Sequence, residues 1–233
     1  MKKEIYRNNE RGSSNLNWLK SKFSFSFANY YNPNKMGFGA LRVLNDDIIS
    51  PGKGFGDHPH DNMEIITIVT EGELEHKDNV GGKSVIKAGD VQVMSAGSGI
   101  VHSEFNHSKT KEVKLFQLWI ESKKEDIEPR YDQKKFDIGK NNLTLVVSGE
   151  KSKNNLYIHQ DAKILLGKFE KKEVEYNFNK NNGVYVFVID GSLIVNNEKL
   201  EERDAIGITK TNKIEIKTDS KSYFMVIEVP CFE

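Results

Sequence analysis

The hydrophobic residues of this chain come in short runs, and these runs limit the available folds more than any other feature. Each run is rich in Ile, Val and Phe and is broken by Gly, Asp or Asn. Examples are MEIITIVT (63–70), DVQVMSA (90–96), VKLFQLWIE (113–121), NLTLVVS (142–148), VYVFVID (184–190) and YFMVIEV (223–229). Strands of this length at regular spacing predict an all-β sandwich or barrel.

One segment is ambiguous between helix and strand. SNLNWLKSKFSF (14–25) is the best candidate for an amphipathic helix, although its pattern is weak. Its second half continues as KFSFSF (22–27), which alternates apolar and polar residues with the period of two that is typical of a strand. Both structures therefore stay open for this segment.

A faint internal repeat divides the chain. VTEGEL (69–74) and VIDGSL (188–193) each follow a hydrophobic run and precede another, so each predicts a tight turn between paired strands. AGD (88–90) and ERD (202–204) then precede the next strand of each copy. The sequence thus contains two copies of one β unit.

The repeat predicts two β domains in tandem. We expect an N-terminal domain at residues 1–130 and a C-terminal domain at residues 131–233. EPRYDQKKF (128–136) is the expected crossing segment between them.

Charge and cysteine content exclude several classes of protein. Lys plus Arg and Asp plus Glu both number 34, and no block of like charge predicts binding to nucleic acid. The single cysteine, Cys231, makes no internal disulfide and excludes a Cys-rich zinc site. The N-terminus lacks the apolar run of a signal peptide, and no run approaches the roughly 20 residues that cross a bilayer. We expect a cytoplasmic protein with no membrane partner.

The stretch GFGDHPHDNME (54–64) is the first candidate for chemistry. If it is extended, His58 and His60 lie on one face, about 6.6 Å apart along the chain. Two imidazoles at this separation can converge on one metal ion. The intervening Pro59 suits an edge strand or a turn.

A second stretch, GSGIVHSEF (97–105), supplies further ligands. His102 and Glu104 are two residues apart and face the same way in a strand. Together with the histidine pair they form a set of three nitrogens and one oxygen, which suits several transition metals. Glu64 has the same parity as His58 in a regular strand and competes for the carboxylate role.

At these residues the sequence resembles a known family. The histidine pair with Glu64 resembles the first motif of cupins, and AGDVQVMSAGSGIVHSE (88–104) resembles the second, with Ser95 where the usual proline stands. The longer strings resemble the bacterial branch of the pirins over nearly the whole chain. These strings include GFGDHPHDNMEI (54–65), EGELEHKDNVG (71–81) and EPRYDQ (128–133).

The resemblance implies a bicupin, which is a pair of tandem cupin (jelly-roll) β-barrels. It implies that the N-terminal barrel holds one divalent transition metal per chain through His58, His60, His102 and Glu104. Iron (Fe2+) is the first choice, and Cu, Ni, Mn, Co and Zn stay open. Glu64 would then lie outside the ligand set and orient a ligand imidazole. The C-terminal barrel is expected to be metal-free.

The resemblance also implies an activity. Bacterial pirins act as quercetin 2,3-dioxygenases, which open the central ring of flavonols with O2 and release CO. A carboxylate must accept the proton of the flavonol 3-hydroxyl, and either Glu104 or Glu64 could serve. The alternative is a metal-binding, redox-sensing regulatory protein that acts through protein partners.

Three other features are interpreted as structural. His76 and Asp78 flank the turn DNVGG (78–82), which favours a hydrogen bond within the turn. His159 is expected to pack or to form a hydrogen bond between the two barrels. The aromatic residues of FSFANYY (25–31) are expected in the core, with a lining of the metal pocket as the alternative.

Overall fold

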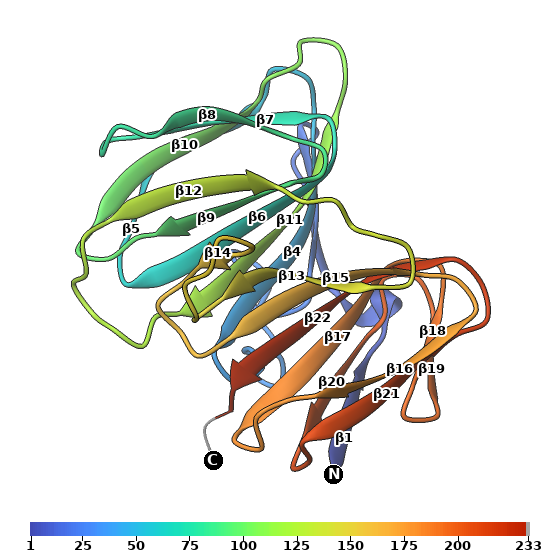
Figure 1. The fold of residues 1–233 in the computed structure, drawn as a ribbon. Coiled ribbons are helices and arrows are strands. Elements are labelled where there is room, and N and C mark those ends of the chain that lie inside the picture. Colours follow the sequence, from blue (N-terminus) through green and yellow to red (C-terminus); the bar gives the residue numbers. More distant parts are fainter. Residues whose placement is uncertain (232–233) are drawn as a thin grey trace.

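Two β-barrels, each made of one large and one small sheet, form the protein (Figure 1). The computed structural model describes residues 1–231, in which a three-residue 3-10 helix, η1 (Asn8–Glu10), accompanies the strands. No helix in these residues is long and apolar enough to cross a bilayer.

The first barrel pairs a seven-stranded sheet with a four-stranded sheet. In spatial order the large sheet contains β12 (Arg130–Lys135), β9 (Asp90–Ser95), β6 (Met63–Glu71), β11 (Val113–Glu121), β4 (Leu41–Ile49), β3 (Leu19–Phe23) and β2 (Gly12–Asn15). The small sheet contains β5 (Gly54–His60), β10 (Ile100–Asn106), β7 (Glu73–Asp78) and β8 (Lys83–Lys87).

The second barrel repeats this arrangement of one seven-stranded and one four-stranded sheet. Its large sheet contains β1 (Lys2–Tyr6), β20 (Ala205–Thr209), β17 (Asn182–Asp190), β22 (Ser222–Pro230), β15 (Lys163–Phe169), β13 (Leu143–Ser148) and β14 (Leu156–Tyr157). Its small sheet contains β16 (Lys172–Asn177), β21 (Lys213–Thr218), β18 (Leu193–Val195) and β19 (Glu198–Leu200). The predicted all-β fold of two tandem jelly-roll barrels is confirmed.

The repeated turn motifs have the same backbone conformation. Gly72 joins β6 to β7 with φ of 80°, and Gly191 joins β17 to β18 with φ of 79°. A Cβ on Gly72 would also lie 2.6 Å from the carbonyl oxygen of Glu112, and one on Gly191 would lie 2.3 Å from that of Lys221. Glycine is therefore required at both turns for conformation and for space.

The ambiguous segment near the N-terminus is a hairpin. β2 and β3 pair antiparallel, and Asn17 adopts a φ of 65° in the turn between them. The strand alternative for KFSFSF is therefore correct for its first part, and the helix alternative is wrong.

Each barrel completes its large sheet with a strand that precedes the other barrel in the sequence. β1 pairs with β20 of the second barrel (Figure 1, blue beside orange). β12 pairs with β9 of the first barrel. The division at residues 1–130 and 131–233 stays a prediction, and both of these strand pairings cross it.

The two large sheets face each other across a continuous apolar layer. Side chains such as Leu44, Ile66 and Phe116 of the first barrel meet Tyr185 and Phe187 of the second in one buried cluster. Burying each such side chain contributes about 1.5–3 kcal/mol. This layer holds the barrels together and leaves the small sheets on the outside.

A charged network crosses the same interface. The carboxylate of Asp46 accepts hydrogen bonds from Arg203 Nε at 2.8 Å and from Arg11 Nη1 at 3.4 Å. The guanidinium groups lie over the rings of Phe116 and Phe187, at 5.3 Å and 5.2 Å from the centroids. Burial lowers the pKa of Arg11, and the charge of Asp46 opposes this effect.

We expect Asp46→Ala to lower the free energy of unfolding by about 3 kcal/mol, because the buried Arg11 would lose its counter-charge. Chemical denaturation measures this change. Asp132→Ala is the matched control, since it removes a carboxylate from the more exposed pair with Arg130 and should cost at most about 1 kcal/mol. Equal losses for both variants would contradict the assigned role of Asp46.

Candidate metal centre

The pairing of β5 with β10 brings the three predicted histidines together. In this antiparallel pair His102 lies opposite His58, and Ile100 lies opposite His60. The ring centroids are 4.4 Å apart for His58 and His102, 4.9 Å for His58 and His60, and 5.0 Å for His60 and His102. Each ring offers a nitrogen within 4.8 Å of the others, which forms a group able to hold a metal ion.

The proline between the first two histidines fits its position. β5 is the edge strand of the small sheet, so Pro59 has a paired neighbour on one side only. An edge strand tolerates the missing N–H of proline. The edge also leaves His58 and His60 half-buried, while His102 is buried.

Hydrogen bonds leave specific nitrogens of this group free for a metal. His58 Nδ1 lies 2.8 Å from the carbonyl oxygen of Gly56 and donates to it, so its lone pair is on Nε2. His102 Nδ1 faces His76 Nδ1 at 3.4 Å. His102 Nε2 is buried without a hydrogen-bond partner among residues 1–231. A buried imidazole nitrogen without a hydrogen-bond partner is suited to bind a metal, so the group of three histidines fits a metal ion.

The surroundings keep the imidazoles of His60 and His102 neutral. Burial, followed by the charge of the neighbouring His58, lowers the pKa of His60 to about 4. Burial, followed by the charges of the other histidines, lowers the pKa of His102 to about 2. Neutral imidazole is the form that binds metals.

Glu104 lies beside this group rather than within it. Its carboxylate is in a second group of potential ligands, with His76 and His102, so His102 is common to both groups. A bulge in the β5–β10 pairing falls between His102 and Glu104. The carboxylate accepts a hydrogen bond from Gln117 Nε2 at 2.8 Å. Burial raises the pKa of Glu104.

Glu64 lies on the face of the large sheet that points away from the three histidines. Its carboxylate accepts hydrogen bonds from Ser95 Oγ at 2.7 Å and from His159 Nδ1 at 3.2 Å, toward the second barrel. The expected parity with His58 fails because Asn62, with φ of 46°, interrupts the chain between β5 and β6. Neither orientation of a ligand imidazole nor proton transfer at the centre is supported for Glu64. The prediction that His159 links the barrels is confirmed.

A row of polar side chains extends behind Glu104 across the large sheet. Strand register places Asn45 beside Gln117, Gln117 beside Thr67, and Thr67 beside Gln92. These side chains face the barrel interior, and all of them except Gln117 are buried. The interior near the candidate centre is therefore polar, while both ends of the barrel are apolar.

Aromatic residues form a wall beside the histidines. The ring of Trp119 meets that of His60 at 4.9 Å, and Phe27 meets Trp119 at 5.4 Å, both edge to face. Trp119 Nε1 donates to Gln117 Oε1 at 3.2 Å. Phe27 thus agrees with the pocket-lining alternative for segment 25–31, whereas Phe25 is in the core between the barrels.

The sequence analysis did not identify Gln117 and Trp119 as residues of this site. The signal was present in VKLFQLWIE, where both residues have the parity of the inward-facing Leu115. A polar residue among inward-facing apolar ones marks a site that needs a hydrogen bond.

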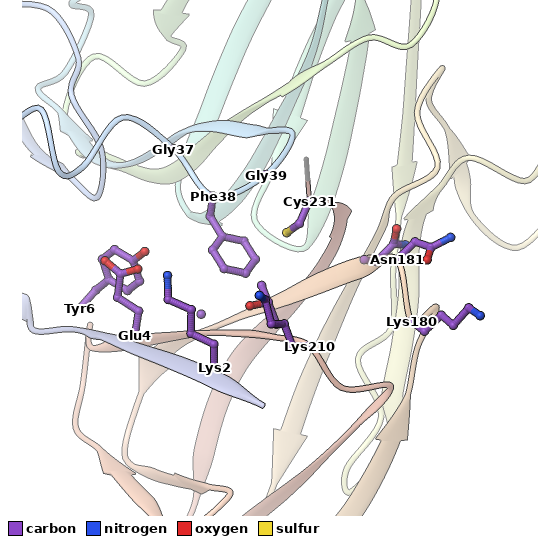
Figure 2. A pocket seen from close by; sticks show the side chains of 13 residues that line it. Lys2, Glu4, Tyr6, Gly37, Phe38, Gly39, Lys180, Asn181, Lys210 and Cys231 are labelled. Atoms are coloured by element: carbon purple, nitrogen blue, oxygen red, sulfur yellow. The ribbon is translucent and has the colours of Figure 1, made fainter. Parts of the chain in front are cut away.

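A separate cavity of about 830 Å³ lies at the second barrel, and none of the predicted ligands lines it. Figure 2 shows the ring of Phe38 and the sulfur of Cys231 beside it, with Lys2 and Lys210 nearby. Burial raises the pKa of the Cys231 thiol. The candidate metal centre is therefore distinct from this hollow.

Comparison with known proteins identifies the relatives of this chain. The family model described as pirin matches residues 5–120, and the model described as quercetinase C-terminal cupin domain matches residues 145–229. A protein of Escherichia coli K12 named quercetin 2,3-dioxygenase is 43% identical over 223 residues, covering 95% of this chain and 96% of that protein. A pirin-like protein of Caulobacter vibrioides is 43% identical over 201 residues, covering 84% of this chain and 86% of that protein.

A solved structure has the same fold and was determined with a bound metal. The bacterial pirin YhhW of Escherichia coli in complex with nickel(II) superposes with a TM-score of 0.95 at 40% identity, covering 99% of this chain and all of that one. Together with the group of three imidazoles, these findings support a metal enzyme of the cupin type that uses a divalent metal. The chain belongs to the pirin family.

Proposed function

We propose that this protein is a metal-dependent dioxygenase that opens the central ring of flavonols such as quercetin with O2 and releases CO. The observation that carries the proposal is the triangle of His58, His60 and His102 at the edge of the first barrel. The aromatic wall beside it suits a planar aromatic substrate. Relatives with the quercetin 2,3-dioxygenase name add support.

The proposed metal ligands are His58, His60 and His102, with Glu104 completing the set. Iron (Fe2+) stays the first choice, and nickel is favoured among the others by the nickel complex of the related pirin. When bound, the metal supplies a Lewis acid that lowers the pKa of a coordinated hydroxyl and a route for electrons between flavonol and O2.

The residues around the proposed ligands orient the substrate and receive its proton. Trp119 and Phe27 offer an apolar surface against which the flavonol rings can pack. Glu104 accepts the proton of the 3-hydroxyl, since its carboxylate shares a ligand group with His102. Gln117 holds that carboxylate with one N–H while its own carbonyl accepts from Trp119, so the amide cannot turn over without losing both bonds.

The proposed activity predicts O2-dependent loss of quercetin with release of CO. We expect turnover by metal-loaded wild-type protein in air, none without O2, and none after removal of the metal with a chelator. His60→Ala should lower kcat/KM by at least about a hundredfold, because it removes a proposed ligand. Flavonol absorbance measures the loss of quercetin, and CO detection measures the released product.

His107→Ala is the matched control in the same barrel, since His107 is an exposed histidine that contacts Glu75. Its turnover should equal that of wild-type protein. The proposal fails if protein with one metal per chain leaves quercetin unchanged in air.

The two glutamates should respond differently to the same change. We expect Glu104→Gln to weaken metal binding by about 10–100-fold, because the proposed carboxylate ligand is lost. Glu64→Gln should leave metal affinity within about twofold, and should lower the free energy of unfolding by about 1 kcal/mol through its bond with His159. Chelator competition and denaturation measure the two effects. Equal loss of metal affinity in both variants would refute this assignment.

A further inference from the structure

His76 is a buried histidine that the proposed ligand set does not include. It lies on β7, opposite Glu104 of β10, and its side chain is fully buried. The ring of Tyr131, from β12, stacks on it with centroids 4.5 Å apart and an angle of 29° between the planes. The Tyr131 hydroxyl in turn contacts Ser84 and donates to Gln133. Tyr131 belongs to the large sheet, so its ring fixes the imidazole plane of His76 from across the barrel.

Both nitrogens of this ring have partners. His76 Nε2 lies 2.8 Å from Asp78 Oδ2, and His76 Nδ1 lies 3.4 Å from His102 Nδ1. The chain of contacts therefore runs from Asp78 through His76 to His102. It ends at His102 Nε2, the buried nitrogen that has no partner among the described residues.

The carboxylate of Asp78 is fixed in direction. Its Oδ1 accepts the backbone N–H groups of Val80 at 3.0 Å and of Gly82 at 2.7 Å, which leaves Oδ2 for His76. Burial raises the pKa of Asp78, but the hydrogen bonds from His76, Gly82 and Val80 outweigh it and lower the pKa overall. An ionised carboxylate can only accept hydrogen bonds.

These directions determine where the ring protons lie. Because Asp78 can only accept, His76 carries a proton on Nε2. In the neutral ring His76 Nδ1 then holds a lone pair and accepts the proton on His102 Nδ1. The lone pair of His102 is consequently on Nε2, in the group with His58 and His60.

We propose that His76 and Asp78 are positioning residues that set the tautomer of His102 and so present its Nε2 to the metal. The inference rests on the proposed metal centre and assigns no contact with substrate to either residue. His58 has the same tautomer, with its proton on Nδ1, because this nitrogen donates to the carbonyl oxygen of Gly56. For the buried His102, the imidazole of His76 and the carboxylate of Asp78 set the tautomer.

Asp78→Asn is the sharpest test, because it replaces one carboxylate oxygen by an NH2 group and reverses the direction of the hydrogen bonds from Asp78 through His76 to His102. The N–H groups of Val80 and Gly82 require an oxygen, so the amide nitrogen of the variant faces His76 Nε2 and donates to it. His76 then carries its proton on Nδ1 and donates to His102, whose own proton moves to Nε2. The nitrogen meant for the metal is blocked.

Nitrogen-15 NMR of the metal-free protein reads the tautomers directly. We expect His102 protonated on Nδ1 in wild-type protein and on Nε2 in Asp78→Asn. Calorimetry with Ni2+ should show affinity reduced by about 10–100-fold in this variant. His102 protonated on Nε2 in wild-type protein would overturn the proposal, as would unchanged tautomer and affinity in the variant.

Glu75→Gln is the matched control, since Glu75 is a carboxylate on the same strand in a half-exposed pair with His107. It should change neither tautomer nor affinity. His76→Phe covers the case in which Asp78→Asn fails to fold: it keeps a ring against Tyr131 but offers His102 no acceptor. We expect a mixture of His102 tautomers and a smaller loss of affinity than in Asp78→Asn, and a single Nδ1–H tautomer in this variant would also overturn the proposal.

These readings are separate from catalysis. The tautomers are measured without metal or flavonol, and Ni2+ affinity is measured without turnover. If quercetin is left intact while the Asp78→Asn effects appear, the proposed activity falls and the positioning role stands. If quercetin is turned over while Asp78→Asn matches wild-type protein, the positioning role falls.

Discussion

The packing of the two large sheets against each other is the constraint on which the rest of the structure depends. Each barrel must bury the apolar outer face of its seven-stranded sheet, and in this structure that face packs against the large sheet of the other barrel. The Asp46 network with Arg11 and Arg203 lies within this layer. With the large sheets fixed back to back, the small sheets face outward, and the edge strand β5 can expose a histidine pair.

The interiors of the two barrels differ although their strand orders match. The second barrel is filled with apolar side chains such as Val186, Ile206 and Phe224. The first barrel has apolar ends but a polar middle, where Glu104 meets Gln117 and His76 meets Asp78. Buried polar groups of this kind cost stability unless each finds a partner. The first barrel therefore has less apolar packing in its middle and holds hydrogen-bonded polar pairs near the three imidazoles.

Much of this arrangement could be read from the sequence because it depends on local rules. Short runs rich in Ile, Val and Phe at regular spacing predicted the strands, and the matching strings VTEGEL and VIDGSL predicted the repeat. The sequence also predicted that His58 and His60 share a face, since one proline in an edge strand does not disturb the alternation. The family resemblance then supplied the ligand set that alternation alone left open.

What could not be predicted depends on single residues or on distant partners. A positive φ at Asn62 shifted the parity of Glu64 and turned its side chain toward His159, and no local pattern marks such a residue. A hydrogen bond within the turn at residues 78–82 was expected, and Asp78 accepts it from Val80, but the contact of His76 with His102 joins two strands that are not consecutive in sequence. Pairing of β1 with β20 spans almost the whole chain and leaves no trace in the local sequence of either strand.

That exchange of leading strands has a consequence for synthesis of the chain. β1 leaves the ribosome long before its partner, Ala205–Thr209. The first barrel likewise lacks its outer strand until Lys135 has been added. The first barrel can close its large sheet once β12 has been added, but β1 stays unpaired until Ala205–Thr209 follows, so the nascent protein carries an open strand edge that invites association with other chains. The chain thus gains its full protection from aggregation late, when β20 pairs with β1 in the second barrel.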